Sequence, residues 1–70
     1  MFDLEKLEVG EPYKIGRREY VCDSVILSAT GGEATFHSYA LMHRRLLRVV
    51  GGKWEMCTGK GEVISKGEIK

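Results

Sequence analysis

The chain has 70 residues, of which 43% are hydrophobic and 30% charged, and its formal net charge is +1. This composition is typical of one globular domain, residues 1–70, and not of a disordered segment. A domain of this size buries only about 60% of the surface that its unfolded chain exposes, which argues against a deep catalytic cleft. The near-neutral charge argues against a protein whose whole surface attracts nucleic acid or an acidic membrane.

Charge is nevertheless unevenly placed along the chain. Residues 1–11 carry four acidic side chains and one lysine, whereas residues 42–60 carry five basic side chains and one glutamate. The sequence therefore predicts a local basic surface in the second half of the domain.

Residues 1–11 form a distinct N-terminal segment. With Asp3 as an N-cap, the first seven residues can form a short helix; the alternative is an extended arm whose apolar side chains cover one end of the fold. The segment has no apolar signal-peptide core, and no stretch of the chain has the ~20 apolar residues of a membrane span. We therefore expect a cytoplasmic protein without membrane contact.

Six segments have the composition of short β-strands, and most are separated by glycine turns. They are residues 13–15, 19–29, 34–42, 46–50, 54–57 and 63–65. The long second segment changes its alternation at Asp23 and Ser24, which predicts a β-bulge there. Residues 30–32 are expected to form a hairpin turn, 58–61 a flexible loop and 66–70 a tail. The fold class is therefore all-β, and the expected architecture is a small SH3-like or related antiparallel β-barrel of five to six strands.

The side chains suited to catalysis or metal binding are few. Cys22 and Cys57 lie 35 positions apart, outside any CxxC spacing, so two buried thiols and one disulfide both remain open. Together with His37 and His43 they are the candidates for a thiol catalyst or a zinc site, but their spacing favours neither. We expect no catalytic residue, metal or cofactor, and hence not an enzyme.

Short motifs between residues 7 and 56 carry a resemblance to a known family. They are Val9-Gly10-Glu11, Glu19-Tyr20-Val21, Ser38-Tyr39-Ala40-Leu41 and Gly51-Gly52-Lys53-Trp54. This order resembles a bacterial family catalogued only as a domain of unknown function. The W-x-E-Y-x-L strand of that family matches Tyr39 and Leu41, with Phe36 in place of the tryptophan and Ser38 in place of the acidic residue. The resemblance implies no activity.

One face of the predicted sheet is available for a protein partner. Two apolar pairs, Leu46-Leu47 and Val49-Val50, place apolar side chains on both faces of one strand, whereas a lone small sheet buries only one face. The core is expected to take Tyr39, Leu41, Leu47, Val49, Trp54 and Met56. The opposite face would then carry Phe36, Met42, Leu46 and Val50. The N-terminal arm can cover these residues, or they are exposed to a partner protein or to a second copy, as in a homodimer.

The alternative hypothesis concerns the basic residues of the same region. Arg44, Arg45, Arg48 and Lys53 lie near the aromatic ring of Phe36 in the sequence-based arrangement. Cations beside an aromatic platform are suited to single-stranded nucleic acid. The competing interpretation is a charged strand edge that prevents edge-to-edge pairing.

Overall fold

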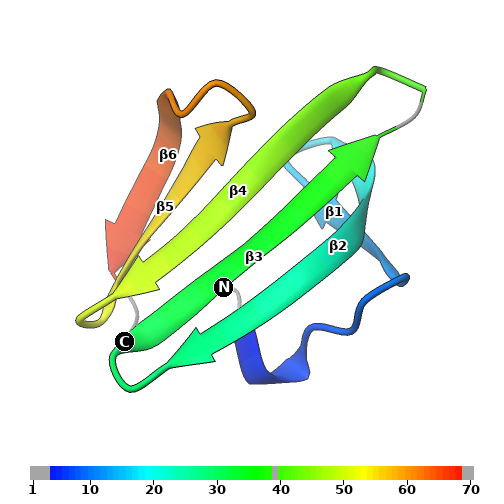
Figure 1. The fold of residues 1–70 in the computed structure, drawn as a ribbon. Coiled ribbons are helices and arrows are strands. Elements are labelled where there is room, and N and C mark those ends of the chain that lie inside the picture. Colours follow the sequence, from blue (N-terminus) through cyan, green and yellow to red (C-terminus); the bar gives the residue numbers. More distant parts are fainter. Residues whose placement is uncertain (1–3, 39, 69–70) are drawn as a thin grey trace.

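The computed structural model describes residues 4–38 and 40–68, which form one antiparallel sheet with its strands in chain order (Figure 1). The 3-10 helix η1 (Leu4–Lys6) precedes β1 (Pro12–Ile15), β2 (Arg18–Ser28), β3 (Gly31–Ser38), β4 (His43–Val50), β5 (Lys53–Thr58) and β6 (Val63–Glu68). The sheet curls into a half-barrel whose edges are β1 and β6. The predicted all-β class is confirmed, but the sheet does not close into a barrel.

The bulge predicted in the long second strand is confirmed. Cys22 pairs with Phe36 and Ser24 with Thr35, so Asp23 is the extra residue of β2. A bulge bends its strand and increases the local twist, which helps a sheet of this size to curl.

The third strand begins and ends earlier than predicted. Gly31 and Gly32 belong to β3 and not to the preceding turn, since both pair with β2 and β4. Their backbone conformations are ones that only glycine adopts easily. Gly32 has a φ of +143°, and a Cβ on it would collide with the carbonyl oxygen of Ile26. At the other end, the Ser38 hydroxyl accepts a hydrogen bond from the Leu41 amide, and the chain turns into β4.

The buried side chains gather on one face of the sheet, here called the core face. They are Leu4, Tyr20, Cys22, Ala34, Phe36, Leu47, Val49 and Met56. The predicted burial of Leu47, Val49 and Met56 is confirmed, and Trp54 packs partly buried against them. Leu41 is half-buried, and Tyr39 lies outside the described residues.

The predicted outward orientation of Phe36 is wrong. Phe36 is only 1% exposed, and it lies on the core face with Ala34, whose register partner is Leu47. The prediction placed Phe36 outward because Tyr39 and Leu41 were taken to continue its strand on the opposite face. β3 ends at Ser38, so those two residues carry no information about which face of the strand is buried.

The N-terminal end agrees with one of the two predicted alternatives, whereas the C-terminal end is more structured than predicted. The N-terminal segment contains a single helical turn, η1, and its Leu4 side chain is buried in the core. The predicted tail continues as β6 to Glu68, which pairs with Lys53. Gly67 permits this pairing, because a Cβ there would lie 2.8 Å from the Trp54 indole nitrogen.

Both cysteines are free and buried, which agrees with the two-thiol alternative. Cys22 is part of the core, whereas Cys57 pairs with Leu46 on the opposite face, here called the outer face. Among residues 4–38 and 40–68, no helix has the length and apolar character needed to cross a membrane.

Candidate functional site

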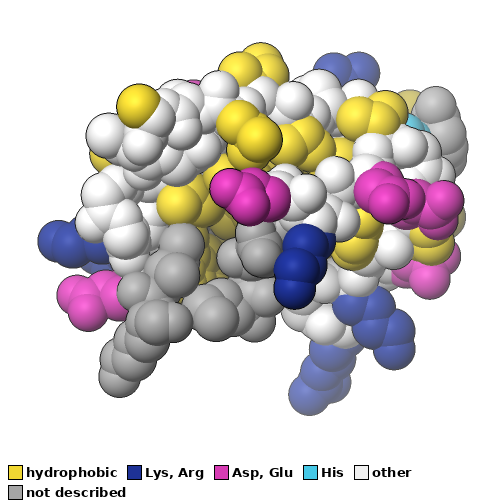
Figure 2. Space-filling model, turned by 90° about the horizontal axis from the view of Figure 1, so that it is seen from below, with side chains coloured by type: hydrophobic (Ala, Val, Ile, Leu, Met, Phe, Trp, Pro, Cys, Tyr) yellow, Lys and Arg dark blue, Asp and Glu magenta, His cyan; other side chains and the backbone are white. Residues whose placement is uncertain are grey.

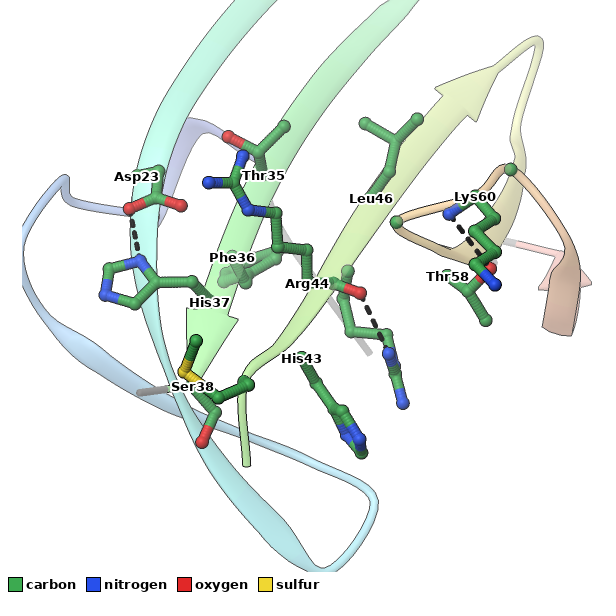
Figure 3. Close-up of a pocket in the computed structure, with 14 residues that line it drawn as sticks. Asp23, Thr35, Phe36, His37, Ser38, His43, Arg44, Leu46, Thr58 and Lys60 are labelled. Carbon is green, nitrogen blue, oxygen red and sulfur yellow. Dashed lines mark hydrogen bonds and ion pairs between the residues drawn. The ribbon is translucent and has the colours of Figure 1, made fainter. Parts of the chain in front are cut away.

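A groove of about 810 Å³ lies where the β3–β4 and β5–β6 hairpins end (Figure 3). We call it the outer groove, because the side chains that enter it from the strands include Thr35, His37, Arg44 and Leu46 of the outer face. Its lining consists of Asp23, Thr35, Phe36, His37, Ser38, Met42, His43, Arg44, Arg45, Leu46 and residues 58–61.

The accessible apolar side chains of the outer groove are Met42 and Leu46, since the third apolar residue of its lining, Phe36, is almost completely buried. Met42 is 84% exposed and has a φ of +54°. A side chain other than glycine in this left-handed conformation costs about 1–2 kcal/mol. Leu46 is half-buried on β4, between the register partners Thr35 and Cys57. An exposed methionine in a costly backbone conformation is suited to contact a partner, since local strain clusters at functional positions.

One wall of the groove is the β5–β6 turn, which is ordered by hydrogen bonds. The Thr58 hydroxyl accepts hydrogen bonds from the amides of Lys60 and Glu62, and the Gly61 amide donates to the Thr58 carbonyl. The turn lies against β4, since a Cβ on Gly59 would be 3.1 Å from the Cβ of Arg44. The loop that was expected to be flexible is therefore a closed turn.

Two cations at this wall have no acidic partner. Arg44 and Lys60 are exposed, and neither makes an ion pair with any residue between 4 and 38 or between 40 and 68. His43 adds an imidazole ring beside them. This end of the outer face is therefore suited to attract an anionic group.

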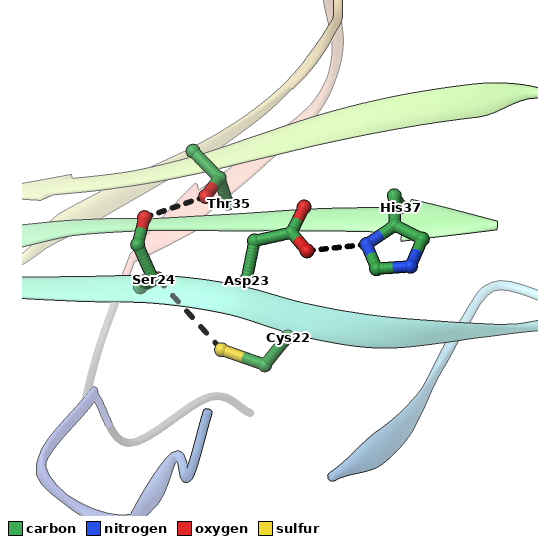
Figure 4. Close-up of polar contacts among 5 residues, drawn as sticks. All are labelled: Cys22, Asp23, Ser24, Thr35 and His37. Atoms are coloured by element: carbon green, nitrogen blue, oxygen red, sulfur yellow. Dashed lines mark hydrogen bonds and ion pairs between the residues drawn. The ribbon is translucent and has the colours of Figure 1, made fainter. Parts of the chain in front are cut away.

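The opposite wall is a polar cluster at the bulge of β2 (Figure 4). His37 Nδ1 contacts the Asp23 carboxylate, and the hydroxyls of Ser24 and Thr35 share a hydrogen bond of 2.6 Å. The bulge makes this arrangement possible, because it directs Asp23 toward the end of β3. The sequence predicts the bulge but not the contact between Asp23 and His37, which are 14 positions apart.

The predicted basic residues do not form one cluster. Arg48 and Lys53 lie on the outer face, but each has an acidic register partner. Arg48 is flanked by Glu33 and Glu55, with a Glu33–Arg48 ion pair of 3.4 Å, and Lys53 is opposite Glu68. Such cross-strand pairs stabilise a sheet surface by about 0.2–1 kcal/mol each. Neither Arg48 nor Lys53 lines the outer groove.

Arg45 has a different environment from its neighbour Arg44, because adjacent residues of a strand face opposite sides. Its guanidinium carbon lies 5.5 Å from the centroid of the Tyr20 ring, on the core face, and its Nη1 donates to the Arg44 carbonyl. Stacking of a guanidinium over an aromatic ring is favourable at this distance. The outer groove is thus lined by Phe36, Met42 and Leu46 of one predicted set and by Arg44 and Arg45 of the other, while Val50 is exposed elsewhere.

The cysteines and histidines are not brought together. Within the described residues, no three side chains among His, Cys, Asp and Glu are placed to hold a metal ion. Burial raises the pKa of the Cys22 thiol; a hydrogen bond with the Ser24 backbone lowers it in part, and the Asp23 charge raises it. A protonated, buried thiol is a poor nucleophile.

No family model, curated protein or solved structure matches this chain. The resemblance to the family of unknown function therefore stays a prediction.

Proposed function

We propose that the protein is a non-enzymatic interaction module that contacts a protein partner through the outer groove. The observation that carries this proposal is Met42, an apolar side chain that is 84% exposed, in a costly conformation, beside the half-buried Leu46. Exposed methionine adapts to the shape of a partner, and burying such a side chain stabilises a complex by about 1.5–3 kcal/mol.

A second copy of the chain is the partner that best complements the groove. Arg44 and Lys60 are unpaired cations in the part of the chain that is described, whereas the N-terminal segment carries exposed Glu8 and Glu11. Figure 2 shows acidic side chains at both ends and in the middle of one face, with Lys and Arg side chains among them and hydrophobic side chains exposed between them. Charges of opposite sign on separate surfaces favour a specific orientation of two copies.

Sedimentation of the protein at concentrations from about 1 μM to 1 mM tests self-association over the range in which weak dimers form. The mass is expected to rise to that of a dimer. The association should weaken as salt is added, because exposed charges are screened beyond about 8–10 Å at ordinary ionic strength. A single species of monomer mass at every concentration would refute self-association.

Binding of single-stranded nucleic acid is the alternative proposal. It is favoured by the free cations Arg44 and Lys60 at the outer groove and disfavoured by the acidic neighbours of Arg48 and Lys53. Titration with a short oligothymidylate at low salt tests it. An affinity that falls steeply with salt and is reduced more by Arg44→Gln than by Arg48→Gln would support it. Absence of binding at low salt would exclude it.

We further propose that the half-barrel is an open relative of SH3-like or similar small barrels. The consecutive antiparallel strands and the bulge that bends β2 support this relation. An experimental structure of the protein in solution tests it: backbone pairing between β1 and β6 would make the barrel complete, whereas a flat sheet would contradict the relation.

A further inference from the structure

A second cavity, of about 340 Å³, opens on the core face, on the side away from the outer groove. It lies between the turn that joins β1 to β2 and the strands β5 and β6, where the half-barrel remains open. We call it the seam cleft. Its principal side chains are Tyr20, Trp54, Ile64, Arg17, Arg18 and Arg45. The volume is at the lower end of the range for small-molecule sites.

The charge of the seam cleft is strongly one-sided. Three arginines line it, and none of the described residues that line it is acidic. Arg17 and Arg18 are exposed, and neither makes an ion pair within residues 4–38 and 40–68. In a chain of net charge +1, a cleft lined by three arginines is a concentrated positive site. Guanidinium groups bind phosphate and carboxylate by paired hydrogen bonds.

The floor of the seam cleft is aromatic. Tyr20 and Trp54 contribute rings, and the Arg45 guanidinium lies over the Tyr20 ring at 5.5 Å. The position of the Trp54 ring depends on Gly67, because a Cβ there would be 2.8–3.0 Å from three indole atoms. Ser65 adds one hydroxyl at the same wall. Aromatic side chains favour flat apolar groups, which stack on them or meet them edge to face.

We propose that the seam cleft binds a small organic anion in which a phosphate or carboxylate is attached to a planar ring. The ring lies against Trp54, and the anion is held by Arg17 and Arg18. A nucleoside monophosphate and an aromatic carboxylate share this chemistry and are both of a size that suits the cleft. The proposal is independent of self-association, because the outer groove shares only Arg45 with this cleft.

Trp54 is the only tryptophan of the chain, so the NMR signal of its indole N–H is unambiguous and reports directly on the cleft. AMP and 2-naphthoate are the two probes, because each carries both a planar ring and an anionic group. Adenosine, which lacks the anion, and inorganic phosphate, which lacks the ring, are the controls. The Trp54 indole and the amides of Arg17 and Arg18 should shift saturably in NMR spectra with at least one probe. The affinity should exceed that of either control by about tenfold or more. The identity of the effective probe distinguishes a phosphate from a carboxylate ligand.

The double variant Arg17→Gln/Arg18→Gln tests the role of the arginines, and Lys53→Gln/Lys66→Gln is the control that removes the same charge outside the cleft. The first should weaken binding by about tenfold or more and the second by about twofold or less. Three results would overturn the proposal: no saturable shift with either probe up to about 10 mM, equal binding of adenosine and AMP without binding of 2-naphthoate, or equal losses in the two double variants.

Discussion

The two faces of the β3–β4 hairpin are built from alternating residues of the same segments, yet they have opposite roles. On the core face, Ala34, Phe36 and Leu47 are almost completely buried. On the outer face, Thr35 and Leu46 form register partners that remain half-exposed. The comparison teaches that register, and not composition, decides whether an apolar or basic residue of this hairpin stabilises the fold or remains available for binding.

The outer face itself differs between its middle and its end. In the middle, Glu33, Arg48, Glu55 and Lys66 alternate in charge across four strands in register. At the end, Arg44 is opposite His37 and has no acidic neighbour in register. The cross-strand partners therefore distinguish two arginines of β4: Arg48 stabilises the sheet surface, whereas Arg44 is available for binding.

The largest expected effect is that of Phe36→Ala on the core face. Truncating a fully buried phenylalanine costs about 3–5 kcal/mol, and the core of so small a domain supplies only about 3–5 kcal/mol in total. The variant should be largely unfolded by circular dichroism at 25 °C. Thr35→Ala, one position away on the outer face, should remain folded. A Phe36→Ala variant as stable as Thr35→Ala would show that the assignment of the two faces is wrong.

The next effect concerns the backbone on the core face. Gly32→Ala places a Cβ against the Ile26 carbonyl oxygen at a positive φ, and it should lower the free energy of unfolding by about 3 kcal/mol or more. Gly52→Ala is the matched control, since Gly52 has a φ of +78° but open space around it. Its cost should be only about 1–2 kcal/mol. Urea denaturation measures both, and equal losses would contradict the close approach of β2 to Gly32.

Met42→Asn separates stability from association at the outer groove. Asparagine tolerates the left-handed conformation, so the variant should be more stable by about 0.5–1 kcal/mol. It should also self-associate about tenfold more weakly, because an apolar contact is lost. Met42→Leu keeps the apolar group and should associate as the native protein does. Thermal unfolding and sedimentation measure the two properties, and an unchanged association in Met42→Asn would exclude Met42 from the contact.

The smallest effect is expected in the middle of the outer face. Arg48→Ala removes an exposed ion pair with Glu33 and should change the free energy of unfolding by about 0.5 kcal/mol or less. Self-association should not change, since Arg48 lies outside the outer groove. A loss of association in this variant, measured by sedimentation, would show that the charged middle of the sheet also belongs to the contact.

The fold class followed from local signals, but the faces of β3 did not. Short strands separated by glycines predicted an all-β domain, and the broken alternation at Asp23 and Ser24 predicted the bulge. The apolar residues on both sides of β4 were assigned correctly, because Leu47 and Val49 share the core face. In β3, however, the residues of the following turn continued the alternation, and only the backbone shows that the strand ends at Ser38.

The candidate site was predicted only in part, for a physical reason. The outer groove combines Asp23 of β2, Arg44 of β4 and Lys60 of a turn, which are brought together by pairing between distant strands. Sequence spacing identifies apolar and basic residues, but not which acidic residue lies opposite each cation. The separation of Arg44 from Arg48 therefore required the register of the sheet.

The most direct test of the proposed contact compares Leu46→Glu with Val50→Glu by sedimentation over the concentration range in which the native protein associates. Both residues lie on the outer face of β4, but only Leu46 lines the outer groove. A buried carboxylate without a partner is strongly unfavourable at an interface, so Leu46→Glu should remain monomeric while Val50→Glu associates as the native protein does. Association of Leu46→Glu with native affinity, or equal loss in both variants, would contradict binding through the outer groove.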